Sequence, residues 1–242
     1  MPNKYKDIIK DYIVIIPARS GSKSIKNKNI KIINGKPLLF YSIESAIKAK
    51  FDNIIISSDS QKYLKISQKH KNIILHRRSN KNSRDTSTDL DVFKEVISFI
   101  NSNLNIKFKY IVHLRPTTPY RNLKILRNAI MSFDKDKSKY SSLRSVNLMS
   151  NPSYKTMRIV NNKLCHLYKR DFNLDSLNQP RQNFQSTYLP NGYIDIIKYK
   201  NIKNNFLHGD KIMPYIIKDI NSDIDDFNDY ISVKKTLEEL NI

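Results

Sequence analysis

Short apolar runs rich in isoleucine and valine alternate along this chain with longer amphipathic stretches. The predicted strands lie at 12–16, 53–57, 73–75, 109–114 and 141–146. The predicted helices lie between them, at 37–50, 61–69, 89–100 and 123–133. Strands that alternate with helices form βαβ units, in which a mostly parallel sheet is covered by helices on both faces. The sequence therefore predicts an α/β fold.

The alternation stops between 147 and 190, where polar residues, prolines and isolated aromatic residues take its place. Strand patterns return at 192–197 and 215–217, and a final helix is predicted at 227–240. We therefore assign 1–146 and 191–242 to one α/β domain, and 147–190 to an insertion within it. The 242 residues are enough to bury a sizeable core.

The charge balance is strongly basic, with 43 lysine and arginine residues against 22 aspartate and glutamate residues. Such an excess is typical of proteins that bind nucleic acids. Here the basic residues are spread among many asparagines and isoleucines, a mixture that an AT-rich coding bias would also produce. We therefore expect no nucleic acid partner. The alternative, a basic nucleic-acid-binding protein, would bind RNA or DNA with a steep dependence on salt.

Two further features concern the cellular compartment. The chain has one cysteine, Cys165, which excludes an internal disulfide and fits a reducing environment. The first eleven residues are charged and lead directly into a strand pattern, so we expect neither a signal peptide nor a membrane-spanning helix. We expect a cytoplasmic protein without a membrane partner.

A basic, serine-rich loop at 18–29 follows the first predicted strand. Ligands of open α/β sheets bind beyond the carboxyl ends of the strands, so this loop is placed to hold phosphates. Arg19, Lys23 and Lys28 would supply positive charge, and Gly21 would let the backbone approach the anion. The loop is not a P-loop, because it lacks the second glycine immediately before the lysine.

Two carboxylates near the end of the sequence, Asp223 and Asp225, are separated by Ile224. In an extended segment they would point to one side while Ile224 faces the core. Mg²⁺ takes oxygen ligands, often one or two carboxylates together with substrate phosphates and water. Alternatively, Ser222, Asp225 and Asp226 form the negatively charged start of the final helix. The two interpretations are compatible.

The first matching block consists of Ile-Pro-Ala-Arg-Ser-Gly-Ser-Lys-Ser-Ile at 16–25, Lys28-Asn29, and Asn-Gly-Lys-Pro-Leu at 34–38. This block resembles the N-terminal signature of the acylneuraminate cytidylyltransferases. The resemblance continues in order with Ile-Ile-Ser-Ser-Asp at 55–59, Arg78 with Asp85-Thr86-Ser87, Leu-Arg-Pro-Thr-Thr-Pro-Tyr-Arg at 114–121, Gln-Pro-Arg-Gln at 179–182, Pro-Asn-Gly at 190–192 and Asp-Ile-Asp at 223–225. A single block matches easily by chance, but an ordered series along nearly the whole chain does not.

The family makes CMP-sialic, CMP-legionaminic and CMP-pseudaminic acids, so the resemblance implies transfer of CMP from CTP to the anomeric hydroxyl of a nonulosonic acid, with release of pyrophosphate. It also implies a Rossmann-like sheet of the nucleotide-diphospho-sugar transferase type. The residues that it assigns to the nucleotide are Arg19, Ser22, Lys28, Asn29 and Arg78. Among them, Arg19 and Lys28 would stabilise charge on the transferred and leaving phosphates. Asp223 and Asp225 would hold Mg²⁺.

The resemblance assigns the sugar to Arg115, Lys155, Arg181 and Asn191. The guanidinium of Arg115 could clamp the carboxylate of a 2-keto sugar acid bidentately, unless it only caps its loop. Lys155 and Arg181 lie in the insertion, through which family members form homodimers, so each could serve either its own or the partner subunit's site. The insertion is thus expected to be a dimerisation element.

Several positions depart from the family pattern. Ser24 stands where glycine is usual, Leu189 where an arginine often precedes Pro-Asn-Gly, and Asp195 where a tyrosine is common. The last two put the identity of the sugar in doubt. A nucleotidyltransferase for another sugar, including the octulosonate class, is the alternative among enzymes, although the Leu-Arg-Pro-Thr-Thr-Pro block argues against that class. A catalytically silent relative that serves as a dimerising scaffold is a third possibility. No histidine is placed as a convincing general base, and His113 lies on a buried-looking strand.

Overall fold

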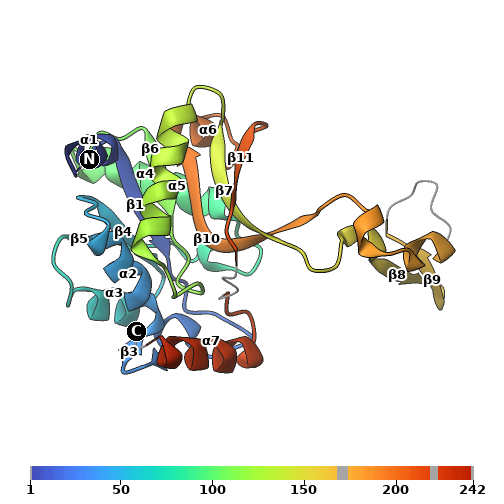
Figure 1. The fold of residues 1–242 in the computed structure, drawn as a ribbon. Coiled ribbons are helices and arrows are strands. Elements are labelled where there is room, and N and C mark those ends of the chain that lie inside the picture. Colours follow the sequence, from blue (N-terminus) through green and yellow to red (C-terminus); the bar gives the residue numbers. More distant parts are fainter. Residues whose placement is uncertain (1, 168–173, 219–222, 241–242) are drawn as a thin grey trace.

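The computed structural model describes residues 2–167, 174–218 and 223–240. Within them, strands form one sheet of seven in the order β11-β7-β10-β6-β1-β4-β5 (Figure 1). The strands are β1 (Tyr12–Pro17), β4 (Ile54–Ser58), β5 (Ile73–Arg77), β6 (Tyr110–His113), β7 (Ser142–Leu148), β10 (Tyr188–Lys198) and β11 (Ile212–Ile216). Neighbours are parallel except where β10 pairs with β6 and β7. The predicted α/β fold with a mostly parallel sheet is confirmed.

Helices cover both faces of the sheet. They are α1 (Pro2–Ile9), α2 (Leu38–Lys48), α3 (Gln61–Ser67), α4 (Asp89–Asn103), α5 (Leu123–Asp136), α6 (Tyr199–Lys203) and α7 (Phe227–Glu239). Successive residues of β1 alternate between the two faces: Val14 and Ile16 pack with α1, α2, α3 and α5, whereas Ile13 and Ile15 pack with α4 and α6. Burial on both faces explains why the strand is a continuous apolar run rather than an alternating one.

Two details of the N-terminal region differ from the sequence-based expectations. Residues expected only as a charged lead-in form α1, which buries Tyr5 and Ile9, four residues apart on one helix face. Pro37 precedes the first turn of α2 instead of lying in it. Asn34 and Gly35 form a tight turn with positive φ angles of 45° and 77° between β2 (Ile32–Ile33) and β3 (Lys36–Pro37), as is typical of an Asn-Gly pair.

A third, small core joins the start of the chain to its end. It contains Ile25 and Ile33 from the loop region, Leu38 of α2, and Leu237 of α7 together with the fully buried Ile224. Because Ile224 lies between the two aspartates of the predicted metal site, this packing fixes that segment beside the 18–29 loop.

The insertion leaves the sheet as an arm that projects away from the domain (Figure 1). Its elements are η3 (Ser153–Lys155), β8 (Met157–Val160), β9 (Lys163–His166), η4 (Leu174–Asn178) and η5 (Arg181–Asn183). β7 and β10 remain paired at its base, up to Leu148 and Tyr188, so the sheet strands extend slightly into the predicted 147–190 insertion. The arm exposes many apolar side chains, among them Ile159 at 73% and Leu164 at 56%.

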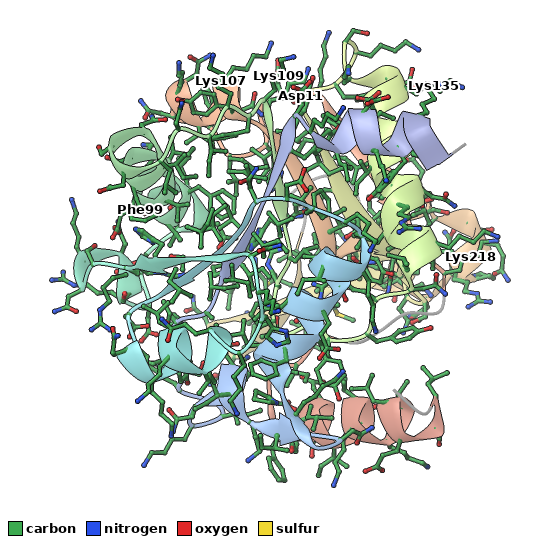
Figure 2. The ribbon with its side chains drawn as sticks, turned by 90° about the vertical axis from the view of Figure 1, so that its left-hand side faces the viewer. Asp11, Phe99, Lys107, Lys109, Lys135 and Lys218 are labelled. Carbon is green, nitrogen blue, oxygen red and sulfur yellow. The ribbon has the colours of Figure 1, made fainter. Side chains whose placement is uncertain are left out.

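Basic residues lie on more than one part of the surface. Figure 2 shows Lys107, Lys109 and Lys135 along the upper edge of the view and Lys218 at its right-hand edge. Among the residues described, none of the helices combines the length and apolar character that a membrane span needs.

Candidate active site

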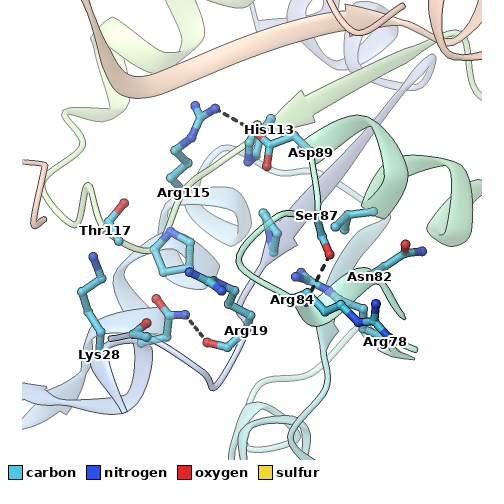
Figure 3. A pocket seen from close by; sticks show the side chains of 15 residues that line it. Arg19, Lys28, Arg78, Asn82, Arg84, Ser87, Asp89, His113, Arg115 and Thr117 are labelled. Atoms are coloured by element: carbon cyan, nitrogen blue, oxygen red, sulfur yellow. Dashed lines mark hydrogen bonds and ion pairs between the residues drawn. The ribbon is translucent and has the colours of Figure 1, made fainter. Parts of the chain in front are cut away.

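A pocket of about 240 Å³ lies beyond the carboxyl ends of β1, β5 and β6 (Figure 3). These strands run parallel to one another, so the loops that follow them meet at one edge of the sheet. The five residues that the resemblance assigns to the nucleotide all line the pocket, and Arg115 lines it as well; the five are Arg19, Ser22, Lys28, Asn29 and Arg78. We call residues 18–29 and 78–87 the loop wall, and residues 113–115 with Asp89 the strand wall.

The loop after β1 is held by hydrogen bonds to buried or partly buried groups. The Ser20 backbone N–H and hydroxyl both donate to Asp59, at 2.8 and 2.6 Å. The Asn29 side chain, 5% exposed, donates from Nδ2 to the carbonyl oxygen of Arg19 at 2.9 Å. Asn29 belongs to η1 (Lys28–Ile30), a short 3₁₀ helix that closes the loop. Asn29 therefore orders the backbone that carries Arg19.

Asp85 ties the two segments of the loop wall together. Its carboxylate accepts from Arg19 Nη1 at 2.6 Å and lies 2.5 Å from Lys23 Nζ. Hydrogen bonds from Lys23 and then Arg19 hold the pKa of Asp85 below its usual value. The sequence singled out Asp85 only as part of a matching block, without a role. Its pairing means that Arg19 is partly neutralised in this structure.

Arg78 is buried and is held by two hydrogen bonds to Ser57 of β4. It is 5% exposed, and it donates from Nε to Ser57 Oγ at 3.2 Å and from Nη2 to the Ser57 carbonyl at 2.9 Å. Burial lowers its pKa below the usual value for arginine, although Asp59 opposes this. Arg78 therefore joins the loop wall to β4 and also faces the pocket.

Lys28 meets the predicted metal site. Its Nζ donates to the carbonyl oxygen of Ile224 at 2.6 Å and lies 3.9 Å from Asp225 Oδ1. The Ile224 N–H donates to Thr117 O at 2.9 Å, which fixes the segment against the loop after β6. Lys28, which lines the pocket, thus contacts the Asp223–Asp225 segment almost 200 residues away in the sequence, although neither aspartate lines the pocket itself.

One of the two interpretations of the acidic segment, the negatively charged start of the final helix, is confirmed. Asp226 caps α7 and forms a capping box with Asp229, so the helix start does not need the carboxylates of Asp223 and Asp225. Desolvation where this segment packs on the domain raises the pKa of Asp225, and the neighbouring Asp223 carboxylate adds to it. Such repulsion favours binding of a cation. Within the described residues, no third His, Cys, Asp or Glu completes a metal-binding group.

Gly192 allows β10 to approach this segment closely. Its φ is +67°, and a Cβ there would lie 2.7 Å from Thr118 Oγ1 and 3.2 Å from Asp223 Oδ2. The neighbouring Asn191, predicted to bind the sugar, does not line the pocket. Its side chain accepts from Ser145 Oγ and donates to Asn147 Oδ1, each at 2.6 Å. Asn191 therefore supports the irregular part of β10.

Arg115 does not present the free guanidinium that the sequence suggested for a substrate carboxylate. Its Nη1 donates to Asp195 Oδ2 at 2.8 Å and its Nη2 to Asp89 Oδ2 at 3.0 Å. Burial lowers the pKa of Arg115, but Asp195 and Asp89 outweigh burial and raise it above the usual value. Each terminal nitrogen already donates one hydrogen bond to a protein carboxylate, so a substrate carboxylate would have to bind through the remaining N–H groups.

The alternative, that Arg115 only caps its loop, is also not what the structure shows, because Arg121 fills that role. Arg121 donates from Nη2 to the Arg115 carbonyl at 2.8 Å and from Nε to the Tyr193 carbonyl at 2.9 Å. It also contacts the carbonyl of Thr118. Burial lowers the pKa of Arg121 to about 10. The sequence included Arg121 in a matching block, and nothing local indicated this structural role.

His113 lies at the base of the strand wall and is fully buried. Burial, and then Arg115, lower its pKa to about 4, against the opposing effect of Asp89 and Asp195. Neither ring nitrogen has a hydrogen-bond partner among the residues described. His113 is therefore neutral near pH 7, and it is buried as its strand pattern suggested.

The remaining predicted sugar contacts lie on the arm. Lys155 is in η3, with its Nζ 5.4 Å from the centre of the Phe184 ring, and Arg181 begins η5. Neither lines the pocket of its own chain, and the arm that carries them points away from it (Figure 1). The structure therefore does not bring Lys155 and Arg181 together with the pocket residues of their own chain.

Comparison with known proteins agrees with the fold and the pocket. A family model described as cytidylyltransferase matches residues 13–210. The chain is 28% identical over 225 residues to N-acylneuraminate cytidylyltransferase of Escherichia coli O18:K1:H7, covering 90% of this chain and 50% of that protein. It is 34% identical over 129 residues to pseudaminic acid cytidylyltransferase of Campylobacter jejuni serotype O:2, covering 53% and 55% of the two chains. The chain spans about half the length of these curated relatives.

A solved structure of CMP:2-keto-3-deoxy-manno-octonic acid synthetase with CTP superposes with a TM-score of 0.68. The match covers 95% of this chain and 99% of that one at 14% identity, so it shows the shared fold alone. The family match, by contrast, extends from β1 beyond the end of α6 and includes both walls of the pocket. On this ground the chain belongs to the cytidylyltransferase family.

Proposed function

We propose that this protein transfers CMP from CTP to the anomeric hydroxyl of a nonulosonic acid and releases pyrophosphate. The observation that carries the proposal is the pocket that Arg19 and Lys28 line at the carboxyl edge of the sheet, where Lys28 also contacts the Asp223–Asp225 segment. This arrangement combines donors for phosphate oxygens with carboxylates for a cation. The relatives named for sialic and pseudaminic acids support the choice of CTP and of this sugar class.

In the proposed reaction, the sugar hydroxyl oxygen forms a bond to the α-phosphorus of CTP while the bond to the pyrophosphate oxygen breaks. Such a step depends on positioning and on stabilising developing charge. Arg19 and Lys28 would supply that charge from the loop wall, and Asn29 would keep Arg19 in place. The proton of the attacking hydroxyl would pass to water, because the ring of His113 is fully buried.

We further propose that Asp223 and Asp225 hold Mg²⁺. Two carboxylates, of which Asp225 is largely exposed, leave room for phosphate oxygens and water, which is the ligand set that Mg²⁺ usually takes. When bound, the ion would neutralise charge on the triphosphate. The raised pKa of Asp225 supports this assignment, because a nearby cation would relieve its repulsion with Asp223.

For the sugar acid we propose a contact with Arg115. Asp195 and Asp89 each accept one hydrogen bond from its guanidinium, so the sugar would bind through the other N–H groups.

We also propose a cytoplasmic enzyme, which is supported by the fit of a single cysteine to a reducing compartment.

A homodimer formed through the arm is part of the proposal. The β8–β9 hairpin pairs the exposed Ile159 with the exposed Leu164, and an apolar pair on such a projecting element favours burial against a partner. An Ile159→Glu variant should convert a dimer to a monomer in light scattering after gel filtration. Phe206→Glu, at an equally exposed apolar site on the main domain, should stay dimeric. A monomeric wild-type protein would contradict this part.

The test of the reaction is pyrophosphate release with CTP, Mg²⁺ and a panel of sialic, legionaminic and pseudaminic acids. An octulosonate belongs in the panel, and ATP, GTP and UTP serve as controls. We expect release with CTP and at least one nonulosonic acid. Release only with the octulosonate would mean that the substrate belongs to the octulosonate class and not to the nonulosonic acids. No release with CTP and any of these acids would contradict the proposed activity.

A further inference from the structure

Arg84 lines the pocket but has no role in the assignments above. It follows η2 (Lys81–Ser83) and lies beside Asn82 and Ser87 on the loop wall (Figure 3). Its backbone N–H donates to Ser87 Oγ at 3.1 Å, and Ser87 Oγ donates in turn to Lys81 O at 3.0 Å. The backbone of Arg84 is therefore held in place, while its side chain faces the pocket.

The other cationic side chains of the pocket are already bound by the protein. Their partners are Asp85 for Arg19, the Ile224 carbonyl for Lys28, Ser57 for Arg78, and Asp89 with Asp195 for Arg115. Arg84 differs from all of them, because among the described residues no hydrogen bond or ion pair reaches its guanidinium. A pocket cation without a partner is the one that gains most when an anion enters.

The position of Arg84 indicates which anion it meets. It directly precedes Asp85, which is bound to Arg19 and Lys23 of the 18–29 loop. Figure 3 shows Arg84 and Arg19 on the side of the pocket opposite Arg115. In an in-line transfer, the leaving pyrophosphate lies on the side of the α-phosphorus away from the attacking sugar. If the sugar lies at the strand wall, the terminal phosphates lie at the loop wall.

We propose that Arg84 binds the β- and γ-phosphates of CTP. This inference rests on the proposed function. The planar guanidinium matches phosphate oxygens in a bidentate manner, and such charge-assisted bonds are stronger than neutral ones. Arg84 sits next to the Arg19–Asp85 pair, so a bound triphosphate would contact both arginines at once.

The direct test is calorimetric binding of CMP, CDP and CTP to the wild-type protein, Arg84→Ala and Arg84→Lys. We expect Arg84→Ala to weaken CTP binding about tenfold and to leave CMP binding unchanged, because only the terminal phosphates lose a contact. Arg84→Lys should bind CTP with an affinity between those of the wild type and Arg84→Ala, since lysine keeps the charge but lacks the planar guanidinium that binds bidentately. In the pyrophosphate assay, the KM for CTP should rise and the KM for the sugar acid should not.

Arg77→Ala is the matched control. Arg77 is exposed, ends β5 and does not line the pocket, so its removal takes away the same charge from a nearby position. The proposal fails if Arg77→Ala weakens CTP binding as much, if CMP loses as much affinity as CTP, or if only the KM for the sugar acid rises. If the wild-type protein and Arg84→Ala bind CTP equally well, this inference alone is wrong. If the wild-type protein shows no turnover of CTP, the proposed function is wrong as well.

Discussion

The two walls of the pocket both carry arginines bound to aspartates, yet the two sets of ion pairs differ in burial. On the loop wall, Arg19 and Asp85 have side chains that are 35% and 40% exposed. On the strand wall, Arg115 is 21% exposed and its partner Asp195 is 2% exposed. An exposed pair is worth little and exchanges easily, whereas a buried pair is costly to break. On the loop wall, Arg19 can therefore exchange Asp85 for a phosphate. On the strand wall, Arg115 stays bound to Asp195 whether or not a substrate is present.

The largest expected effect tests the loop wall as the source of catalytic charge. Lys28→Ala should lower kcat for pyrophosphate release by two to three orders of magnitude, which corresponds to about 3–4 kcal/mol for the loss of one preorganised donor. The side chain is 12% exposed and points at the Asp223–Asp225 segment, so solvent cannot easily replace it.

Lys23→Ala is the control for this variant, because Lys23 lies in the same loop but its side chain is 84% exposed. It should reduce turnover far less. Near-normal turnover by Lys28→Ala, with CTP binding intact, would remove Lys28 from the catalytic assignment.

The next effect tests the fixed character of the strand wall. Asp195→Asn removes the buried charge that faces Arg115 at 2.8 Å and Arg144 at 3.6 Å. We expect the free energy of unfolding in urea to fall by about 2–3 kcal/mol, because arginines remain without a full partner. The KM for the sugar acid should rise while the affinity for CTP stays the same.

Asp85→Asn makes the equivalent change on the loop wall, where both partners are exposed. It should leave the free energy of unfolding almost unchanged. If the two variants lose the same stability, the contrast between the walls is wrong.

The smallest effect concerns the pH dependence of stability at His113. Its pKa is lowered to about 4 in the folded protein, below the 6.5 of the free side chain. As pH falls from 6.5 toward 4, the unfolded chain binds a proton that the folded chain does not, so the free energy of unfolding decreases. The decrease approaches about 1.4 kcal/mol for each pH unit in this window and is absent above it.

His113→Gln should show a shallower loss of stability between pH 6.5 and 4.5 than the wild type, measured by urea unfolding at each pH. His76→Gln is a useful comparison, because burial also lowers the pKa of His76 but its Nε2 lies 3.8 Å from Glu95. Parallel curves for wild type and His113→Gln would mean that the burial of His113 has no such cost.

Most of the loop wall could be predicted from the sequence because its residues are contiguous. Arg19, Ser22, Lys28 and Asn29 follow one strand, and the position of that strand in a parallel sheet places them at the binding edge. Arg84 and Asp85 gave no such signal. Both lie in an exposed polar stretch, and their importance comes from contacts across the pocket.

The strand wall was predicted less well. Arg115 was expected to be a free clamp, because nothing in the sequence indicates that Asp89, the first residue of α4, and Asp195 of β10 reach the same guanidinium. Asn191, which the resemblance assigns to the sugar, has an amide that hydrogen-bonds Ser145 and Asn147 of β7, a role in holding β10 that nothing local in the sequence indicated.

The sequence by itself determined the α/β sheet, the basic loop after β1 and the pair of aspartates around a buried isoleucine. These features depend on periodicity and local spacing, which are properties of short segments. Only the tertiary structure decided which charges are available to a ligand. Availability depends on burial and on partners that approach from distant parts of the chain, as Asp195 approaches Arg115 and the Ile224 carbonyl approaches Lys28.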